Sequence, residues 1–412
     1  MGFLRRSGRR VTTALTRLFK TTAGLLAIAL LTGCWSSIEL NNRAFVSVML
    51  IDQTDKGVEL TLGFPLTNRL IPGQTGGSGV SATASSAQPN AYISRVGPSL
   101  EDALQKIQGD VPRQIAFGQT HSIIIGSRFA ERGVEPILEF VLRNPYLKMN
   151  TNLFLVEGPV RNKVAQMSIP FERFLASVLN GYVSNRQIMS TTVKDLMYSK
   201  ANGGDGLLPI LGFIHNNAAL APGSPPSLTT AGAAILRNGK LVETRLKPSE
   251  LSSARAILNQ LKQYIYSIDS PTDGGKIGFY TTSLDMTIRP ALTGEDFKIV
   301  IRCKLQAVII ASDSEIDLES KGEIRQLEQA INKIANEGFA SVVAKTRQAG
   351  ADVFGFALYF SVRYPREWNR IKEQWRDYYK NRLEVKIETD AMLKRSGSSV
   401  HSIREKFLND EA

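Results

Sequence analysis

The tetrapeptide Leu31-Thr32-Gly33-Cys34 and the residues before it determine in which compartment the rest of this chain must fold. Six basic side chains and no acidic one precede an uninterrupted apolar run of nine residues, Ala23 to Leu31. A basic region, a short apolar region and small residues before a cleavage point are typical of an export signal. A membrane-spanning helix needs about 20 apolar residues, so this run would anchor a protein poorly. The sequence therefore predicts that residues 1–33 are a signal peptide and that the remainder is exported.

The cysteine that follows this leader predicts a lipid attachment site. Leu31-Thr32-Gly33-Cys34 resembles the lipobox of bacterial lipoproteins, in which the cysteine thiol receives a diacylglyceryl group and the leader is then removed. The resemblance implies that Cys34 becomes the acylated first residue of the mature chain and binds it to membrane lipid. Two acyl chains hold a protein stably, whereas one holds it only marginally. The alternative is an ordinary signal peptide whose cysteine is incidental.

Length, charge and cysteine content limit the other possibilities. Without the 33 leader residues, 379 of the 412 remain, which suggests two or three domains. The net charge falls from +12 to +6 because six basic residues leave with the leader, and we therefore expect no nucleic-acid partner. Acylation of Cys34 would leave Cys303 without a disulfide partner in the mature chain. Cys303 shares a strand face with isoleucine and leucine residues, which predicts a core thiol.

Residues 34–220 alternate strand and helix patterns, which predicts a mixed α/β region of one domain or two subdomains. A buried strand at 44–51 and an alternating strand at 58–64 predict a hairpin, and Ser99 predicts the cap of a helix. The uncharged segment 72–89 predicts a mobile loop. A Gly-rich phosphate cradle is its alternative, but no Gly-Lys-Ser/Thr ending is present. Further strands are predicted at 121–125, 152–156 and 207–215, and further helices at 134–143, 171–179 and 193–200.

The uncharged, Pro-rich segment 218–227 predicts a linker to a C-terminal α/β region of residues 228–395. Asn238-Gly239 between two strand patterns predicts a type I′ hairpin. A helix that begins at Pro248 is predicted to carry one apolar stripe as far as Ile265. Two long strands at 276–289 and 296–310, a long helix at 316–348, a helix around two tryptophans and a strand at 383–389 are predicted to follow, before a polar tail at 396–412.

The sequence shows no catalytic apparatus. Its three histidines, His121, His215 and His401, have no second ligand at the spacing of a metal site. No nucleophile elbow and no Walker loop is present. Carboxylate pairs such as Glu101-Asp102 and Glu295-Asp296 could serve a glycosidase, although their surface and turn contexts favour solvated acids. We therefore predict no enzyme activity, no cofactor and no metal site.

Two tryptophans near the C-terminus are candidate partner-contact residues. Trp368 and Trp375 lie seven residues apart, so one helix would present both on the same face. Core packing is one interpretation. A membrane-surface or partner-docking face is the other, because indole combines an apolar ring with a polar N–H group. Asp352 is interpreted as a helix cap rather than a ligand.

Short motifs along the chain occur in an order that resembles a known family. They comprise Cys34-Trp35 with Glu39-Leu40, the segment 117–126, Leu142-Arg143-Asn144-Pro145, Lys345-Thr346-Arg347-Gln348, the segment 351–356, Tyr364-Pro365, Trp368 and Trp375. Together they resemble the Ger(x)C proteins, the C-subunit lipoproteins of spore nutrient-germinant receptors. Ser36 and Ser37 depart from the charged residues usual in that family, and the loop at 72–89 is longer than expected.

The resemblance implies a fold, partners and a location. It implies a multi-domain α/β (α+β mixed) protein, with three domains, mixed or antiparallel sheets and packed helices. It also implies a non-catalytic subunit that acts with integral-membrane A-type and B-type receptor subunits to trigger germination. Its location would be the outer face of the cell membrane, which is the inner membrane of the spore, where Cys34 anchors it through lipid.

Two other classes of lipoprotein remain as alternatives. A solute-binding lipoprotein of an ABC transporter would share the lipobox and the size, but such proteins carry two Rossmann-like lobes with regular strand–helix alternation. This chain instead has consecutive hairpin patterns and long paired strands. A tethered cell-wall hydrolase is the enzyme alternative.

Overall fold

The computed structural model describes residues 19–22, 39–65, 90–166, 172, 174–203, 205–214, 226–318 and 320–394. Cys34, the loop at 72–89, most of the predicted linker and the tail at 396–412 lie outside these residues. The chain divides into two compact units, Met1–Ala44 and Phe45–Ala412. The smaller unit contains the short 3₁₀ helix η1 (Leu40–Asn42), and both sheets described below belong to the larger unit.

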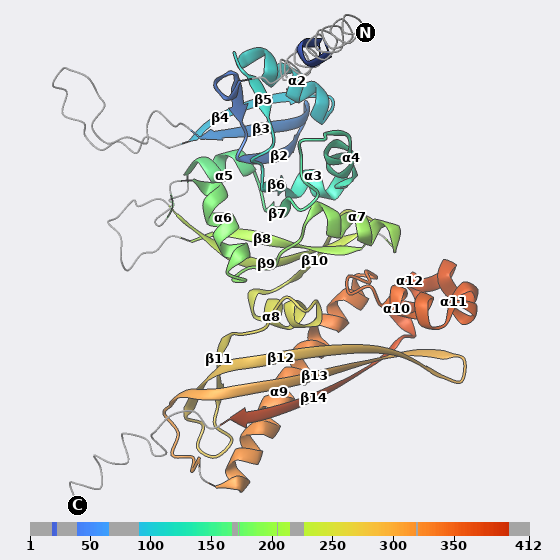
Figure 1. Ribbon diagram of the computed structural model, residues 1–412. Helices are drawn as coiled ribbons and strands as arrows, with labels where there is room; N and C mark the ends of the chain where they lie inside the picture. The colour runs from blue at the N-terminus through green and yellow to red at the C-terminus, as the bar shows by residue number, and fades with distance from the viewer. Residues whose placement is uncertain are drawn as a thin grey trace, which may run out of the picture. The chain divides into compact units, whose positions relative to one another are not determined.

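An eight-stranded mixed sheet forms the first layer of the larger unit (Figure 1). Its spatial order is β10-β9-β8-β7-β6-β2-β3-β4, with parallel pairing from β2 through β6 and β7 to β8 and antiparallel pairing elsewhere. The central strands β6 and β7 are entirely buried, because helices cover a parallel sheet on both faces. The strands are β2 (Val48–Thr54), β3 (Gly57–Pro65), β4 (Asn90–Gly97), β6 (Ser122–Gly126), β7 (Asn152–Val156), β8 (Gly206–Ile214), β9 (Ser227–Arg237) and β10 (Lys240–Leu246).

In the described part of the chain, helices α2 to α7 connect or flank these strands. The hydroxyl of Ser99 accepts a hydrogen bond from the amide of Asp102 and caps α2, which confirms the predicted start of that helix. Apolar residues of α5 and α6 pack with Val48, Ile124 and Phe154 of the sheet. The helices are α2 (Leu100–Asp110), α3 (Ser127–Arg132), α4 (Glu135–Arg143), α5 (Val160–Gln166), α6 (Leu175–Ser184) and α7 (Val193–Ala201); two short strands, β1 (Arg43–Phe45) and β5 (Gln114–Ala116), lie outside the large sheet.

The hairpin β9–β10 extends this sheet although it follows the predicted linker. Asn238 and Gly239 at its turn have φ values of 51° and 71°, the left-handed backbone that a type I′ turn requires. The predicted hairpin is therefore confirmed. Its strand β9 pairs with β8 in antiparallel register. The linker at 218–227 thus separates β8 from β9 in the sequence but not in the sheet, and the division into regions 34–220 and 228–395 stays a prediction.

A four-stranded sheet, order β11-β12-β13-β14, forms the second layer. The two long predicted strands are present as β12 (Lys276–Thr293) and β13 (Asp296–Ser312), and β13 pairs in parallel with β14 (Glu384–Lys394). One face of β12 and β13 packs in a core with the long helix α9 (Lys321–Gln348). Cys303 is buried in this core, as predicted.

The helix predicted from Pro248 to Ile265 is shorter than expected. Helix α8 (Pro248–Ile257) ends two residues before Asn259, which adopts a left-handed φ of 58°. The amide side chain of Gln260 then bonds the backbone N–H and C=O of Ser190 and draws the chain away from the helix axis. Ile265 begins strand β11 (Ile265–Asp269) and is 70% exposed. The helix itself packs between β9 and β12.

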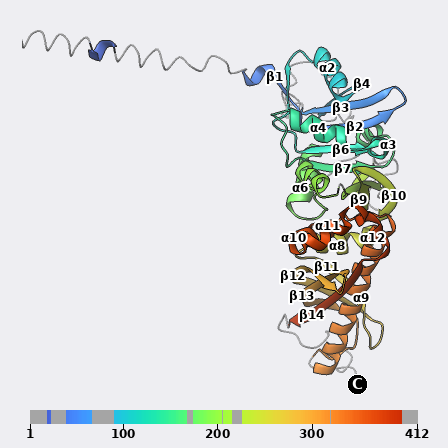
Figure 2. The same ribbon diagram turned by 90° about the vertical axis from the view of Figure 1, so that its right-hand side faces the viewer.

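The helix predicted around the two tryptophans is interrupted. After α10 (Phe356–Arg363), the chain forms α11 (Pro365–Ile371), a 3₁₀ turn η3 (Lys372–Gln374) and α12 (Trp375–Asn381). These helices lie together beside the β12–β13 hairpin (Figures 1 and 2). The mixed α/β fold class, with mixed sheets and packed helices, is confirmed.

Candidate functional site

The C-terminal motif region, Lys345 to Trp375, is the candidate site, and two glycines shape its backbone. Helix α9 ends where Gly350 adopts a left-handed φ of 62°. The amide of Ala351 then donates to the carbonyl of Thr346 and closes the last turn. A second left-handed residue, Gly355 with φ 69°, precedes α10. The segment between these glycines therefore turns sharply and places Asp352 beneath the start of α10.

Asp352 caps α10, as predicted from the sequence. Its Oδ1 accepts a hydrogen bond from the amide of Phe356 at 2.9 Å, and its Oδ2 accepts one from Ala357 at 2.7 Å. Burial raises the pKa of this carboxyl to about 6, although hydrogen bonds from the Ala357 and Phe356 amides and from Trp375 lower it. The carboxylate is thus used to hold the start of α10.

Trp375 and Trp368 have different environments. The indole of Trp375 is 7% exposed and donates to Asp352 Oδ2 at 3.1 Å. Trp368 is half-buried and packs edge-to-face on Trp375, with ring centroids 5.1 Å apart. Phe360, Tyr378 and Tyr379 complete this aromatic cluster. Trp375 is therefore a core side chain in this structure, and partner contact through either tryptophan stays a prediction.

Arg376 joins the motif region to the eight-stranded sheet. Its guanidinium donates to both carboxylate oxygens of Asp205, at 3.1 and 2.9 Å, and to the carbonyl of Gly350 at 2.9 Å. Asp205 also accepts the amide of Asp352 at 2.8 Å and that of Asn238 at 2.9 Å. We call Arg376, Asp205 and these three backbone partners the Arg376 clamp. No sequence pattern indicates this clamp, because Asp205 and Arg376 lie 171 positions apart and share no motif spacing.

The first residues of the motif region also have structural partners. Lys345 Nζ bonds Glu250 Oε2 of α8 at 2.6 Å. Burial would raise the pKa of Glu250, but hydrogen bonds from Lys345, the Lys247 amide and Ser341 lower it. The Thr346 hydroxyl bonds the Tyr379 hydroxyl at 2.7 Å, and Arg347 donates to the carbonyl of Tyr379 at 3.1 Å. The motif thus ties α9 to α8 and α12.

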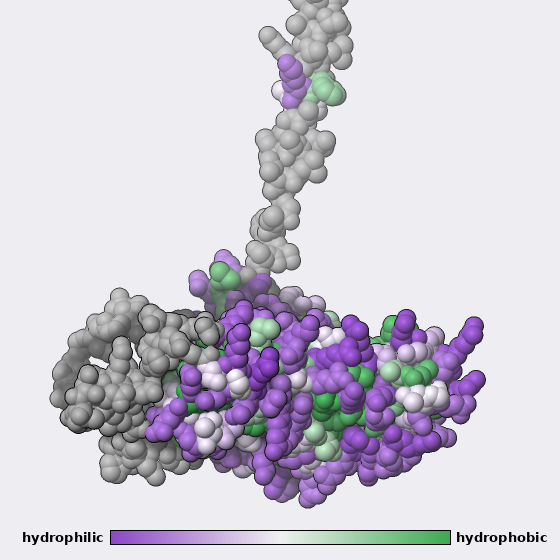
Figure 3. All heavy atoms as spheres, turned by 90° about the horizontal axis from the view of Figure 1, so that it is seen from below, coloured by the Kyte–Doolittle hydropathy of each residue, from purple (hydrophilic) through white to green (hydrophobic). Residues whose placement is uncertain are grey.

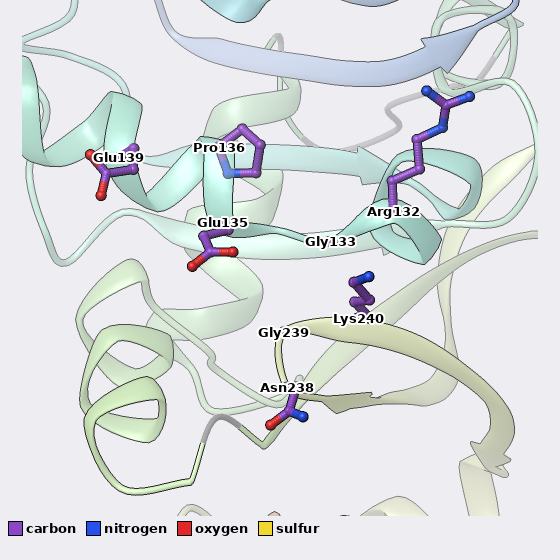
Figure 4. A pocket seen from close by; sticks show the side chains of 8 residues that line it. All are labelled: Arg132, Gly133, Glu135, Pro136, Glu139, Asn238, Gly239 and Lys240. Atoms are coloured by element: carbon purple, nitrogen blue, oxygen red, sulfur yellow. The ribbon is translucent and has the colours of Figure 1, made fainter.

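Two pockets lie near these contacts. One of about 270 Å³ lies beside the clamp, and its walls include Asp205, Asp352, Tyr198 and Leu358. The other, of about 320 Å³, lies between α4 and the β9–β10 turn. Figure 4 shows its acidic side chains, Glu135 and Glu139, on one side and its basic side chains on the other.

Two negative findings concern the described part of the chain alone. No group of His, Cys, Asp and Glu side chains there could hold a metal ion. No helix there has both the length and the apolar composition needed to cross a membrane.

Comparison with known proteins identifies the family. Residues 36–213 match the family described as spore germination protein N-terminal domain, and residues 231–397 match that described as spore germination B3/GerAC like, C-terminal. These matches define the class of the protein, a spore germination protein. The chain belongs to the GerAC-like family of spore germination proteins, and the resemblance to the Ger(x)C proteins is confirmed.

Individual relatives are similar in sequence to this chain over most of its length. Spore germination protein KC of Bacillus subtilis (strain 168) is 20% identical over 404 residues, which cover 94% of this chain and 97% of that protein. Spore germination protein YndF of the same organism is 21% identical over 377 residues, with coverages of 86% and 91%. The crystal structure of the GerBC protein covers 84% of this chain and 96% of its own at 16% identity, with a TM-score of 0.53. That similarity shows a shared fold.

Proposed function

We propose that this chain is a lipoprotein subunit of a spore nutrient-germinant receptor, anchored through Cys34. It acts without catalysis, by contact with integral-membrane A-type and B-type subunits, to trigger germination. Two observations support the anchor and the role: the lipobox at residues 31–34 and membership of a spore germination family.

The non-catalytic role is inferred from the motif side chains, which bond other parts of the protein. Lys345, Thr346 and Asp352 each bond a named partner within the protein. Residues that serve catalysis would instead converge on an open cavity with a reactive group. Here they hold α8, α9, α10 and α12 in one arrangement, which suits a protein that presents a surface to partners.

A lipid anchor makes weak contacts sufficient for this role. Two acyl chains confine the protein to the membrane, and confinement raises its effective concentration toward membrane subunits. The location that follows is the outer face of the cell membrane, which is the inner membrane of the spore. The alternative of a solute-binding lipoprotein predicted two regular Rossmann-like lobes, whereas the chain has an eight-stranded mixed sheet and a four-stranded sheet with long hairpin strands.

The test uses spores that lack this protein and spores complemented with the full-length chain. We expect spores without it to lose their fall in optical density with one nutrient or a small group of nutrients, and complementation to restore it. Affinity purification of the tagged, lipidated chain from spore membranes should recover both integral-membrane subunits. Normal germination with every nutrient, in a strain with no second copy, would overturn the receptor role. Recovery of a transporter permease instead would support the solute-binding alternative.

A further inference from the structure

The outer surface of α10 and α11 combines exposed apolar and basic side chains. Val362 is 75% exposed and Tyr359 is 36% exposed on α10. Arg363 ends that helix, and Arg366 and Arg370 follow at one-turn spacing on α11, all three exposed. We call these five residues the α10–α11 surface. Both helices lie toward the viewer in Figure 2.

Most of the positive charge in this segment is not neutralised by neighbours. From Phe356 to Arg382 the chain has seven basic and three acidic residues. Arg376 is bound in the clamp, and Arg382 pairs with Asp296 at 3.7 Å. Among the residues that the structure describes, no ion pair forms with Arg363, Arg366 or Arg370. The acids Glu367, Glu373 and Asp377 are interspersed but fewer, so the segment keeps a net positive charge.

We propose that the α10–α11 surface binds an anionic phospholipid bilayer. The three arginines would bond lipid phosphates, and their aliphatic stems, Val362 and the ring of Tyr359 would lie at the boundary between headgroups and acyl chains. Basic residues near a membrane surface attract anionic lipids. The inference extends the proposed function, since the Cys34 anchor would deliver this surface to a bilayer.

An acidic protein segment is the other occupant that the charge would suit, but the structure favours lipid. A peptide partner binds a groove or a sheet edge, and none of the five residues of the α10–α11 surface lines either of the two pockets described above. The three arginine side chains are long and flexible, and the aliphatic side chain near them is that of Val362. Such a surface suits a flat bilayer, because contacts with lipid headgroups do not require a partner of particular sequence.

The test places an environment-sensitive thiol probe on Val362→Cys in the full-length, lipidated protein, reconstituted in vesicles. Cys303 is 1% exposed and should not react. With phosphatidylcholine vesicles containing about a third phosphatidylglycerol, we expect the emission of the probe to shift to the blue. The shift should be absent in pure phosphatidylcholine and should weaken at 1 M salt, where the Debye length is about 3 Å. The same probe on Met392→Cys of β14, also exposed, should not respond.

Matched charge variants distinguish binding through this surface from a general attraction of the positively charged protein to anionic vesicles. Arg363→Glu with Arg366→Glu and Arg370→Glu should abolish the shift, because each cation is worth roughly fivefold in membrane binding. The same change of charge at the exposed Lys321, Arg325 and Lys333 of α9 should leave the emission shift unchanged. Flotation with neutral vesicles reports the acyl anchor separately, so a failed anchor is distinguished from a failed surface.

Two outcomes would overturn the proposal. One is an equal probe response in neutral and anionic vesicles. The other is an arginine triple variant that keeps its probe response but no longer co-purifies with its membrane subunits, because the α10–α11 surface would then be a protein-docking face.

Discussion

The indole nitrogen of Trp375 and the carboxylate of Asp352 are joined by a 3.1 Å hydrogen bond inside the core. The same carboxylate caps α10 through the amides of Phe356 and Ala357. One buried acid therefore links the start of α10 to the start of α12. Because the motif residues Asp352 and Trp375 depend on each other, their first role is to hold these helices together.

The buried Asp352 should make stability fall as the pH rises. Its pKa is about 6 in the folded protein against an ordinary 3.8, so the folded state keeps the proton to higher pH than the unfolded state. Its contribution to stability is complete below about pH 4 and is lost as the pH rises through about 6, a difference of about 3 kcal/mol. Asp352→Asn should remove this part of the decline in the free energy of unfolding, which urea unfolding measures from pH 4 to 7. The exposed Asp377→Asn is the control, and equal slopes for Asp352→Asn and the wild type would contradict the prediction.

The two tryptophans should differ in their effect on stability. Trp375→Ala should cost about 3–5 kcal/mol, because it empties a buried site and leaves Asp352 with one donor fewer. Trp368→Ala should cost about half as much, since it is only half-buried. If Trp368 also contacts a partner, its variant should fold and be lipidated but recover less of the membrane subunits. Equal losses of stability for both variants would show that Trp368 is as much a core residue as Trp375.

Breaking the Arg376 clamp should lower the free energy of unfolding, and the effects of changing Asp205 and Arg376 should be strongly coupled. Asp205→Asn should cost more than Arg376→Met, because the Asp205 side chain is 5% exposed and that of Arg376 is 37% exposed. We expect about 2–4 kcal/mol for Asp205→Asn and a coupling of about 1–3 kcal/mol in the double-mutant cycle. Chemical unfolding of the four proteins measures both. The surface pair Arg143 and Glu139 is the control cycle and should couple by less than about 1 kcal/mol. An additive clamp cycle would mean that the two side chains act independently.

Replacing Cys34 by Ala should prevent lipidation. Because two acyl chains supply the membrane affinity, the variant should be lost from the membrane or remain only through its uncleaved leader. Incorporation of radiolabelled fatty acid measures this directly. Cys303→Ala is the control and should still be labelled. Label in the Cys34→Ala protein would show that another residue is acylated.

Local features of the fold were accessible from the sequence. The hairpin turn at Asn238-Gly239, the Ser99 cap and the two long strands β12 and β13 follow from short-range chemistry, such as left-handed turn residues, capping hydroxyls and alternating apolar positions. The cap at Asp352 is of the same kind, because its partners lie four and five residues away. The long-range contacts of the site were not predicted, since no local signal pairs Asp205 with Arg376 or Glu250 with Lys345.

The sequence by itself determined the hairpin turn at Asn238-Gly239, the caps at Ser99 and Asp352, the long strands β12 and β13 and, through its motifs, the family. Only the tertiary structure decided that β9 and β10 join the sheet of the preceding region, that β14 pairs in parallel with β13, and that α8 ends at Ile257. The physical reason is range. Turn and helix preferences act over a few residues, whereas sheet order and the pairing of Arg376 with Asp205 depend on how the whole chain packs. The hydrogen bonds between Gln260 and Ser190 are an example, because they end a helix that local periodicity would continue.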